Sequence, residues 1–185
     1  TISKEQNHEI IEDIRKLPAL AQEFLDCDKE ISLLSEQFSG KHHCLFLGRG
    51  VMFPIALEGA LKLKEISYIH AEGYAAGELK HGPIALIDKE MPVVVVAPDN
   101  SLMDKLVSNI EEVRARGALL YIFVSEQAHL KEDSQTRKVS LPDCPEVLQP
   151  ILFTIPLQLL AYHCAVINGT DVDQPRNLAK SVTVE

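Results

Sequence analysis

The chain has 185 residues, of which 46% are hydrophobic and 24% are charged, and this balance is typical of a folded globular domain. Its 18 basic and 27 acidic residues give a formal net charge of -9, which disfavours a nucleic acid partner because sequence-independent phosphate binding needs a basic surface. A chain of this length buries about 70% of the surface that its unfolded form exposes. We therefore expect one domain, residues 1–185, with a substantial core.

The cysteines and the apolar stretches indicate the compartment. The chain has no C-x-x-C pair and no cysteine–histidine spacing of the zinc type, so we expect reduced, mostly structural thiols and a cytoplasmic location. The apolar stretch 151–167 is interrupted by Pro156, Gln158 and His163, and no signal peptide pattern is present, so we predict no membrane span. The four cysteines are Cys27, Cys44, Cys144 and Cys164.

The first predicted elements are helices. Apolar residues recur at helical spacing through residues 1–38, and Pro18 divides them into two predicted amphipathic helices, so we assign 1–40 to an N-terminal helical segment. Residues 41–49 are predicted to form a buried strand around Cys44–Leu47, ending at the turn Gly48-Arg49-Gly50. A helix is predicted from about Pro54 to Tyr68.

The rest of the chain continues this alternation. It predicts a strand at 91–97, a helix at 100–116 closed by Gly117, a strand at 119–124, an edge strand at 138–141 and a long apolar helix at 147–167. Strands that are apolar throughout and alternate with helices predict a parallel sheet covered on both faces. The expected fold is α/β, a three-layer αβα sandwich with a mainly parallel sheet and an irregular C-terminal tail at 168–185.

One predicted helix carries ionisable residues on a single stripe. Glu58, Lys62 and Glu65 stand at i, i+4 and i+7, so they share one helix face. Two interpretations remain open, a solvated face with an ordinary ion pair, or a catalytic base with its helpers. The second is favoured by position, because ligands of open α/β sheets bind beyond the carboxyl ends of the strands.

Two further side chains are candidates for chemistry. His81 lies at a break in structure, where an imidazole titrating near pH ~6.5 suits proton transfer, although a plain loop histidine is equally consistent. Lys180 lies in the polar tail and becomes a nucleophile only if burial or a nearby cation lowers its pKa from about 10.4. The turn after the first strand has Phe53 in place of the third glycine of a dinucleotide motif, so we expect any phosphate to be held elsewhere.

Three segments of the chain match a known family. Residues 56–72, Gly77-Glu78-Leu79-Lys80-His81-Gly82-Pro83 and 173–185 closely resemble the glucosamine-6-phosphate synthases, which are the glutamine:fructose-6-phosphate amidotransferases. The resemblance covers essentially the whole chain. It is of the bacterial type and corresponds to the second sugar isomerase (SIS) half of the isomerase region.

The resemblance implies an enzyme that converts fructose 6-phosphate and glutamine-derived ammonia to glucosamine 6-phosphate, the entry step to UDP-N-acetylglucosamine. It implies a homodimer and neither a cofactor nor a metal. The implied roles are Schiff base formation by Lys180, proton transfer between the first two sugar carbons by Glu65, assistance at the sugar oxygens by Lys62, orientation of the histidine by Glu58, ring opening by His81 of the adjacent subunit, and a backbone contact to the sugar from Ala179.

The chain departs from this family in what it lacks. The N-terminal glutaminase and the first SIS half, with its Ser/Thr-rich phosphate loop, are missing, so we expect little or no turnover by this chain alone. Two alternatives stay open. A simple phosphosugar isomerase would need no nitrogen donor, and Lys180 argues against it. A non-catalytic sugar-phosphate-binding SIS module would need no Schiff base.

Overall fold

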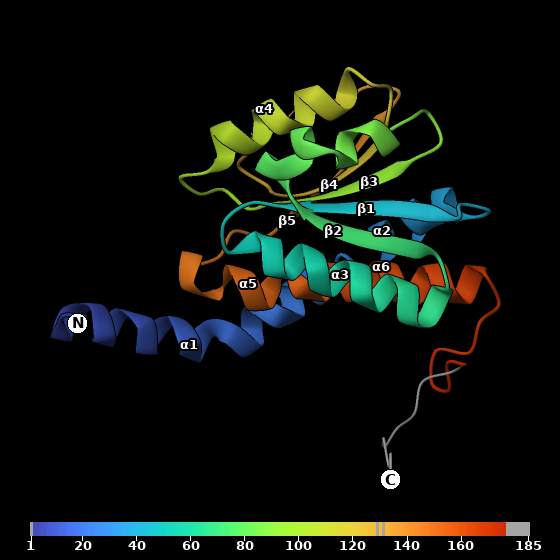
Figure 1. Cartoon of the computed structure of the whole chain (residues 1–185). Helices are drawn as coiled ribbons and strands as arrows, with labels where there is room; N and C mark the ends of the chain where they lie inside the picture. Colours follow the sequence, from blue (N-terminus) through green and yellow to red (C-terminus); the bar gives the residue numbers. More distant parts are fainter. Residues whose placement is uncertain (1, 129, 131, 177–185) are drawn as a thin grey trace, which may run out of the picture.

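The fold is built on a five-stranded sheet with the order β2-β1-β3-β4-β5 (Figure 1). The computed structural model describes residues 2–128, 130 and 132–176. All four strand pairings are parallel, as predicted for the main part of the sheet. The strands are β1 (His43–Gly48), β2 (His70–Ala75), β3 (Pro92–Ala97), β4 (Leu119–Ser125) and β5 (Thr136–Leu141).

Helices cover both faces of this sheet, which confirms the predicted three-layer α/β architecture (Figure 1). One face carries the α-helices α2 (Asp28–Ser35), α3 (Met52–Ser67), α5 (Gln149–Leu152) and α6 (Thr154–Ile167), with α1 (Lys4–Leu25) beside them. The other face carries α4 (Met103–Arg114) and the 3-10 helices η2 (Ala76–His81) and η3 (Pro83–Leu86). Two short 3-10 turns, η1 (Glu36–Phe38) and η4 (Glu146–Leu148), complete the described elements.

The central strands contribute side chains to the cores on both faces of the sheet, because successive side chains of a strand point to opposite faces. In β1, Phe46 packs into the core under α3 and α6, while Leu45 and Leu47 pack under α4. In β4, Tyr121 and Phe123 likewise face α6. Since both faces are covered, these strands are apolar throughout, and the apolar runs allowed them to be predicted from the sequence.

The N-terminal segment corrects one prediction. Pro18 does not separate two helices. It lies inside α1, and the chain turns instead at Asp26 and Cys27 before α2 begins. A helical proline gives up the hydrogen bond to the carbonyl four residues earlier. That residue, Ile14, is 52% exposed, so the missing bond falls on the outer side of α1 and not in the core.

The strand β2 was missed by the sequence analysis. Its sequence, His-Ala-Glu-Gly-Tyr-Ala, lacks the apolar run of a buried strand because β2 is an edge strand, with one side open. Gly73 is needed for space, since a Cβ there would lie 2.9 Å from the Cα of Leu57 in α3. The close approach of α3 to β2 therefore explains a glycine that weakened the strand pattern.

The predicted helix at 147–167 is divided into η4, α5 and α6, with a break at Phe153. By length and composition the run Glu146–Ile167 is apolar enough to cross a membrane. In the fold, however, Leu157, Leu160 and Cys164 of α6 are buried against α2 and α3. We therefore interpret it as a core helix, and its high hydropathy reflects that burial.

Gly48 ends β1 where the chain turns tightly into α3. A Cβ at this position would lie 2.0 Å from the carbonyl oxygen of Met52, a contact that the backbone must move to relieve. We expect Gly48→Ala to lower the free energy of unfolding by about 3 kcal/mol or more, measured by urea denaturation. Gly40→Ala is the comparison, because its positive φ of 72° with open space around it predicts a loss of only about 1 to 2 kcal/mol. Equal losses would contradict the steric explanation.

Candidate active site

The ionisable stripe predicted on α3 is present. Lys62 lies between the two carboxylates, with its Nζ 2.8 Å from Oε2 of Glu65 and 3.8 Å from Oε1 of Glu58. The three side chains are 25% to 37% exposed, so they are neither buried nor freely solvated. They present two negative charges around one positive charge to the outside of the α3 layer.

The charge state of Lys62 limits what it can do. The hydrogen bond to Glu65 is the main cause that raises the pKa of Lys62, and the charges of Glu65 and Glu58 add to it against a smaller opposing effect of burial. Lys62 is therefore a cation at neutral pH. A protonated amine cannot attack a carbonyl, but it can donate hydrogen bonds to oxygen atoms and stabilise negative charge on them.

The stripe does not lie where the sequence analysis expected it. Helix α3 connects the end of β1 to the start of β2, so it runs antiparallel to the strands. Its last turn, with Glu65, is consequently at the amino edge of the sheet rather than at the carboxyl edge. The general rule for ligands of open sheets therefore does not locate Glu65.

The described part of the C-terminal tail folds back onto this end of α3. The Asn168 side chain donates to the carbonyl of Ser67 at 3.3 Å, and the Thr170 hydroxyl donates to the carbonyl of Ile66 at 2.6 Å. These bonds cap the last carbonyl groups of the helix, which lack partners within it. The tail thus begins at the last turn of α3, the turn that contains Glu65.

Tyr68 adds a third connection between α3 and the tail. The backbone N–H of Arg176 donates to the Tyr68 hydroxyl at 2.8 Å, and the Arg176 guanidinium lies 4.1 Å from the centre of its ring. Tyr68 has a φ of 62°, which is uncommon for a residue with a side chain. Sequence reasoning missed Tyr68, Thr170 and Arg176. The predicted residues Ala179 and Lys180 lie outside the described residues.

His81 is not brought to the stripe within one chain. It ends η2, which packs beneath α4 on the opposite face of the sheet from α3 (Figure 1). The six residues of β2, roughly 17 to 20 Å of extended strand, also separate the two regions along the sheet. Within the chain, the Nδ1 of His81 lies 2.7 Å from Oε2 of Glu78.

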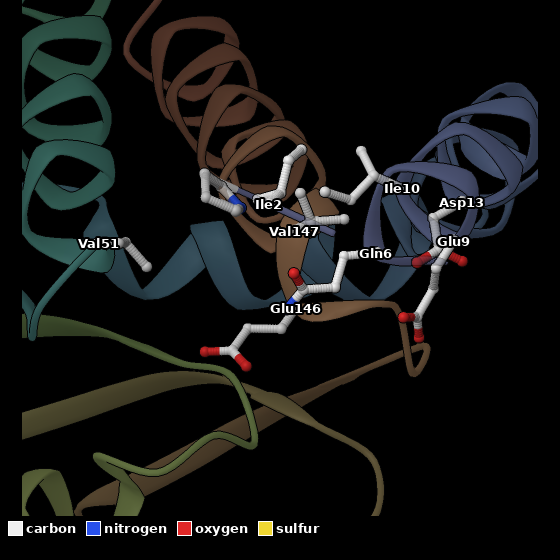
Figure 2. Close-up of a pocket in the computed structure, with 9 residues that line it drawn as sticks. Ile2, Gln6, Glu9, Ile10, Asp13, Val51, Glu146 and Val147 are labelled. Carbon is white, nitrogen blue, oxygen red and sulfur yellow. The ribbon is translucent and has the colours of Figure 1, made fainter. Parts of the chain in front are cut away.

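A cavity of about 560 Å³ lies between α1, the turn before α3 and the start of α5. Figure 2 shows its apolar side chains, among them Ile10, Val51 and Val147, together with acidic residues at its edge. Within the described part of the chain, none of the predicted site residues lines this cavity. It is therefore separate from the candidate site.

The four cysteines are free, as predicted, and Cys44 and Cys164 are buried. Burial raises the pKa of Cys164 to about 12, and burial followed by the charge of Asp143 raises that of Cys144 to about 11. Such thiols are protonated at neutral pH and are poor nucleophiles. Among the described residues, no group of three or more His, Cys, Asp or Glu side chains is placed to hold a metal ion.

The protein is a doubly wound α/β domain, because its parallel five-stranded sheet lies between two helical layers. It has a solvent-accessible polar site, where the ionisable side chains of α3 lie near the folded-back tail. Residues 37–168 match the family model of the SIS domain. The chain belongs to the SIS domain family.

Similar proteins include two relatives named glutamine--fructose-6-phosphate aminotransferase [isomerizing]. The protein from Aliivibrio fischeri is 62% identical over 184 residues, which cover 100% of this chain and 30% of the relative. The protein from Escherichia coli K12 is 63% identical over 178 residues, which cover 96% of this chain and 29% of the relative. The chain therefore spans less than a third of the length of these relatives.

Solved structures agree with the fold. The C-terminal domain of glucosamine-fructose-6-phosphate aminotransferase from Francisella tularensis is 50% identical with a TM-score of 0.88, and the match covers 94% of this chain and 49% of that one. A glucosamine-6-phosphate deaminase from Thermotoga maritima is 25% identical with a TM-score of 0.70, covering 97% and 50% of the two chains. In both cases this chain corresponds to half of the other.

Proposed function

We propose that this chain is the second isomerase half of a glutamine:fructose-6-phosphate aminotransferase, which forms glucosamine 6-phosphate from fructose 6-phosphate and glutamine-derived ammonia. The observation that carries the proposal is the 62% identity over the whole chain to a relative of that name. The resemblance of the segments that contain Glu65, His81 and Lys180 agrees with it. The reaction belongs to amino sugar synthesis, and the free cysteines agree with a cytoplasmic enzyme.

Glu65 is the proposed base of the isomerisation. A ketose-to-aldose change needs one group that removes a proton from the first sugar carbon and delivers it to the second, and a carboxylate held on a helix suits this step. Its neighbour Lys62, a cation 2.8 Å away, would stabilise the negative charge that develops on the sugar oxygens. Glu58, whose Oε1 lies 3.8 Å from Nζ of Lys62, is the carboxylate proposed to orient the histidine of the adjacent subunit.

Lys180 is the proposed nucleophile, and the anchored tail supports its reach to Glu65. Lys180 lies four positions after Arg176, so covalent geometry keeps their Cα atoms within about 14 Å of one another. In the proposed step the amine attacks the carbonyl of the open-chain ketose and water leaves, which gives a Schiff base. The backbone of Ala179 would contact the same sugar.

His81 is proposed to open the sugar ring in a second copy of the chain. Within one chain, β2 and the sheet itself separate η2 from the α3 stripe. A homodimer in which η2 of one protomer meets α3 of its partner would join the two sets of residues. The other proposed partners are the glutaminase domain and the first isomerase half, so this chain alone should convert fructose 6-phosphate poorly.

A chimera tests the proposal, in which this chain replaces the matching 184 residues of the Aliivibrio fischeri relative. With fructose 6-phosphate and glutamine, the chimera should form glucosamine 6-phosphate, whereas this chain with fructose 6-phosphate and ammonium should form little or none. Borohydride added with the sugar should trap a covalent adduct, located on Lys180 by peptide mass spectrometry. Lys180→Met should lose the adduct, and Lys29→Met is the matched control.

The outcomes separate the possible functions. An inactive chimera that still binds fructose 6-phosphate without an adduct would favour a non-catalytic sugar-phosphate-binding module. Interconversion of hexose phosphates without incorporation of nitrogen would favour a simple phosphosugar isomerase. Either result would overturn the proposed aminotransferase.

A further inference from the structure

Arg49 lies in the turn after β1 and has no part in the proposed chemistry. Its Nη1 donates a hydrogen bond to Oδ1 of Asn109 at 3.0 Å. Asn109 belongs to α4 and is only 6% exposed, so the bond is largely shielded from water. A hydrogen bond from a charged donor is stronger than one between neutral groups. Arg49 therefore connects the β1 turn firmly to α4.

The same guanidinium packs against the start of η2. A Cβ on Gly77 would lie 3.0 Å from Nη1 of Arg49, which is tighter than nine in ten real Cβ contacts. Gly77 has no positive φ, so the backbone conformation does not require glycine, and a side chain here would have to displace the end of the Arg49 side chain. The absence of a side chain at Gly77 lets Arg49 lie directly on the backbone of η2.

A second contact holds the other end of η2. Lys80 donates to Oε1 of Glu112 at 2.8 Å, and Glu112 follows Asn109 by three residues on the same face of α4. The hydrogen bond from Lys80 is the main cause that lowers the pKa of Glu112, with help from Asn109 and Arg116. Beside these contacts, Ala76 and Leu79 of η2 are buried in the core between α4 and the sheet.

We propose that Arg49 is a positioning residue, which fixes η2 against α4 and so sets the direction in which His81 projects. His81 directly follows Lys80 and is 73% exposed, so its place depends on the segment that carries it. A histidine that must reach a sugar bound by a partner protomer needs a rigid support. The proposal rests on the role of His81 under the proposed function.

The first test measures the support itself in this chain. Arg49→Met keeps much of the stem and removes the guanidinium. Amide hydrogen exchange in residues 76–81 should become roughly tenfold faster or more, while exchange in β3 and β4 stays unchanged. The NMR signal of the His81 ring should move towards that of an unstructured histidine, and Arg49→Lys should restore part of both effects. Unchanged exchange and an unmoved His81 signal would overturn the proposal.

A double-mutant cycle tests the contact between Arg49 and Gly77. Gly77→Ala alone should also loosen η2, because the new methyl group displaces the guanidinium. In the Arg49→Met background that methyl group has room, so the two effects on exchange should not add. Additive effects would overturn the contact. If Arg49→Met also speeds amide exchange in β3, the variant has disturbed the core. Lys80→Met then tests the same support from the other end of η2, because the Lys80 side chain is 61% exposed and its removal should leave the core intact.

Turnover in the chimera separates this inference from the proposed function. If both hold, Arg49→Met should lower kcat roughly tenfold or more with a smaller change in KM, since the positioned group acts on the bound sugar. Faster exchange in η2 with full turnover would contradict the role of His81 and leave the support by Arg49 intact. Unaltered exchange would contradict the support whatever the turnover.

Discussion

Replacing Glu65 by glutamine in the chimera is expected to lower the rate of glucosamine 6-phosphate formation by about 10² to 10⁴-fold, the range that a positioned acid-base group contributes. Glutamine has nearly the same shape and keeps an oxygen that can accept a hydrogen bond from Lys62, 2.8 Å away in the present structure. The helix should therefore remain intact. Only the capacity to take a proton from the sugar is removed, so kcat should fall far more than KM rises.

Two comparisons make this result specific. Glu23→Gln, on the exposed side of α1, removes one carboxylate from a remote helix and should leave turnover unchanged. Trapping with borohydride should still give an adduct in Glu65→Gln, because in the proposed mechanism the Schiff base on Lys180 forms before the proton moves between the carbons. An enzyme that keeps more than half of its turnover without the Glu65 carboxylate would show that another group is the base.

The sequence predicted those elements whose pattern reflects burial on both faces. Strand β3, Pro-Val-Val-Val-Val-Ala, is buried along its whole length and was found from its apolar run. Strand β2 was missed because it is an edge strand, which is partly exposed and needs no such apolar run. Gly73 also interrupts the strand pattern, because α3 passes too close to leave room for a side chain there. Pro18 gave a wrong helix boundary because local propensity does not reveal that Ile14 is open to solvent.

The candidate site divides in the same way. Helical spacing was sufficient to place Glu58, Lys62 and Glu65 on one face, because that geometry is local. The return of the tail to α3 depends on Thr170 and Tyr68, which lie 102 positions apart in the sequence and share no motif that would pair them. Contacts of this kind follow from tertiary packing, so a single sequence offers no signal for them.

The proposed dimeric site leads to the second large effect, recovery of activity from two inactive variants. In the chimera, Glu65→Gln and His81→Asn should each lower turnover to about 1% or less, because each removes one of the two proposed acid-base groups. If Glu65 and His81 of one site come from different protomers, a mixed dimer of the two variants contains one site with both groups intact and one with neither. The structure supports this arrangement, since α3 and η2 lie on opposite faces of the sheet.

The size of the recovery follows from counting sites. Unfolding and refolding the two variants together in equal amounts should make half of the dimers mixed, and half of their sites intact, so turnover should return to about one quarter of the wild-type value. Coexpression with two affinity tags isolates the mixed dimer, in which the value should reach about one half. Mixing Glu65→Gln with Lys62→Met is the matched control. Both changes lie on α3, so every site of every dimer contains one of them and no intact site can form. Recovery in the control, or none in the test pair, would mean that His81 and Glu65 do not meet across two protomers.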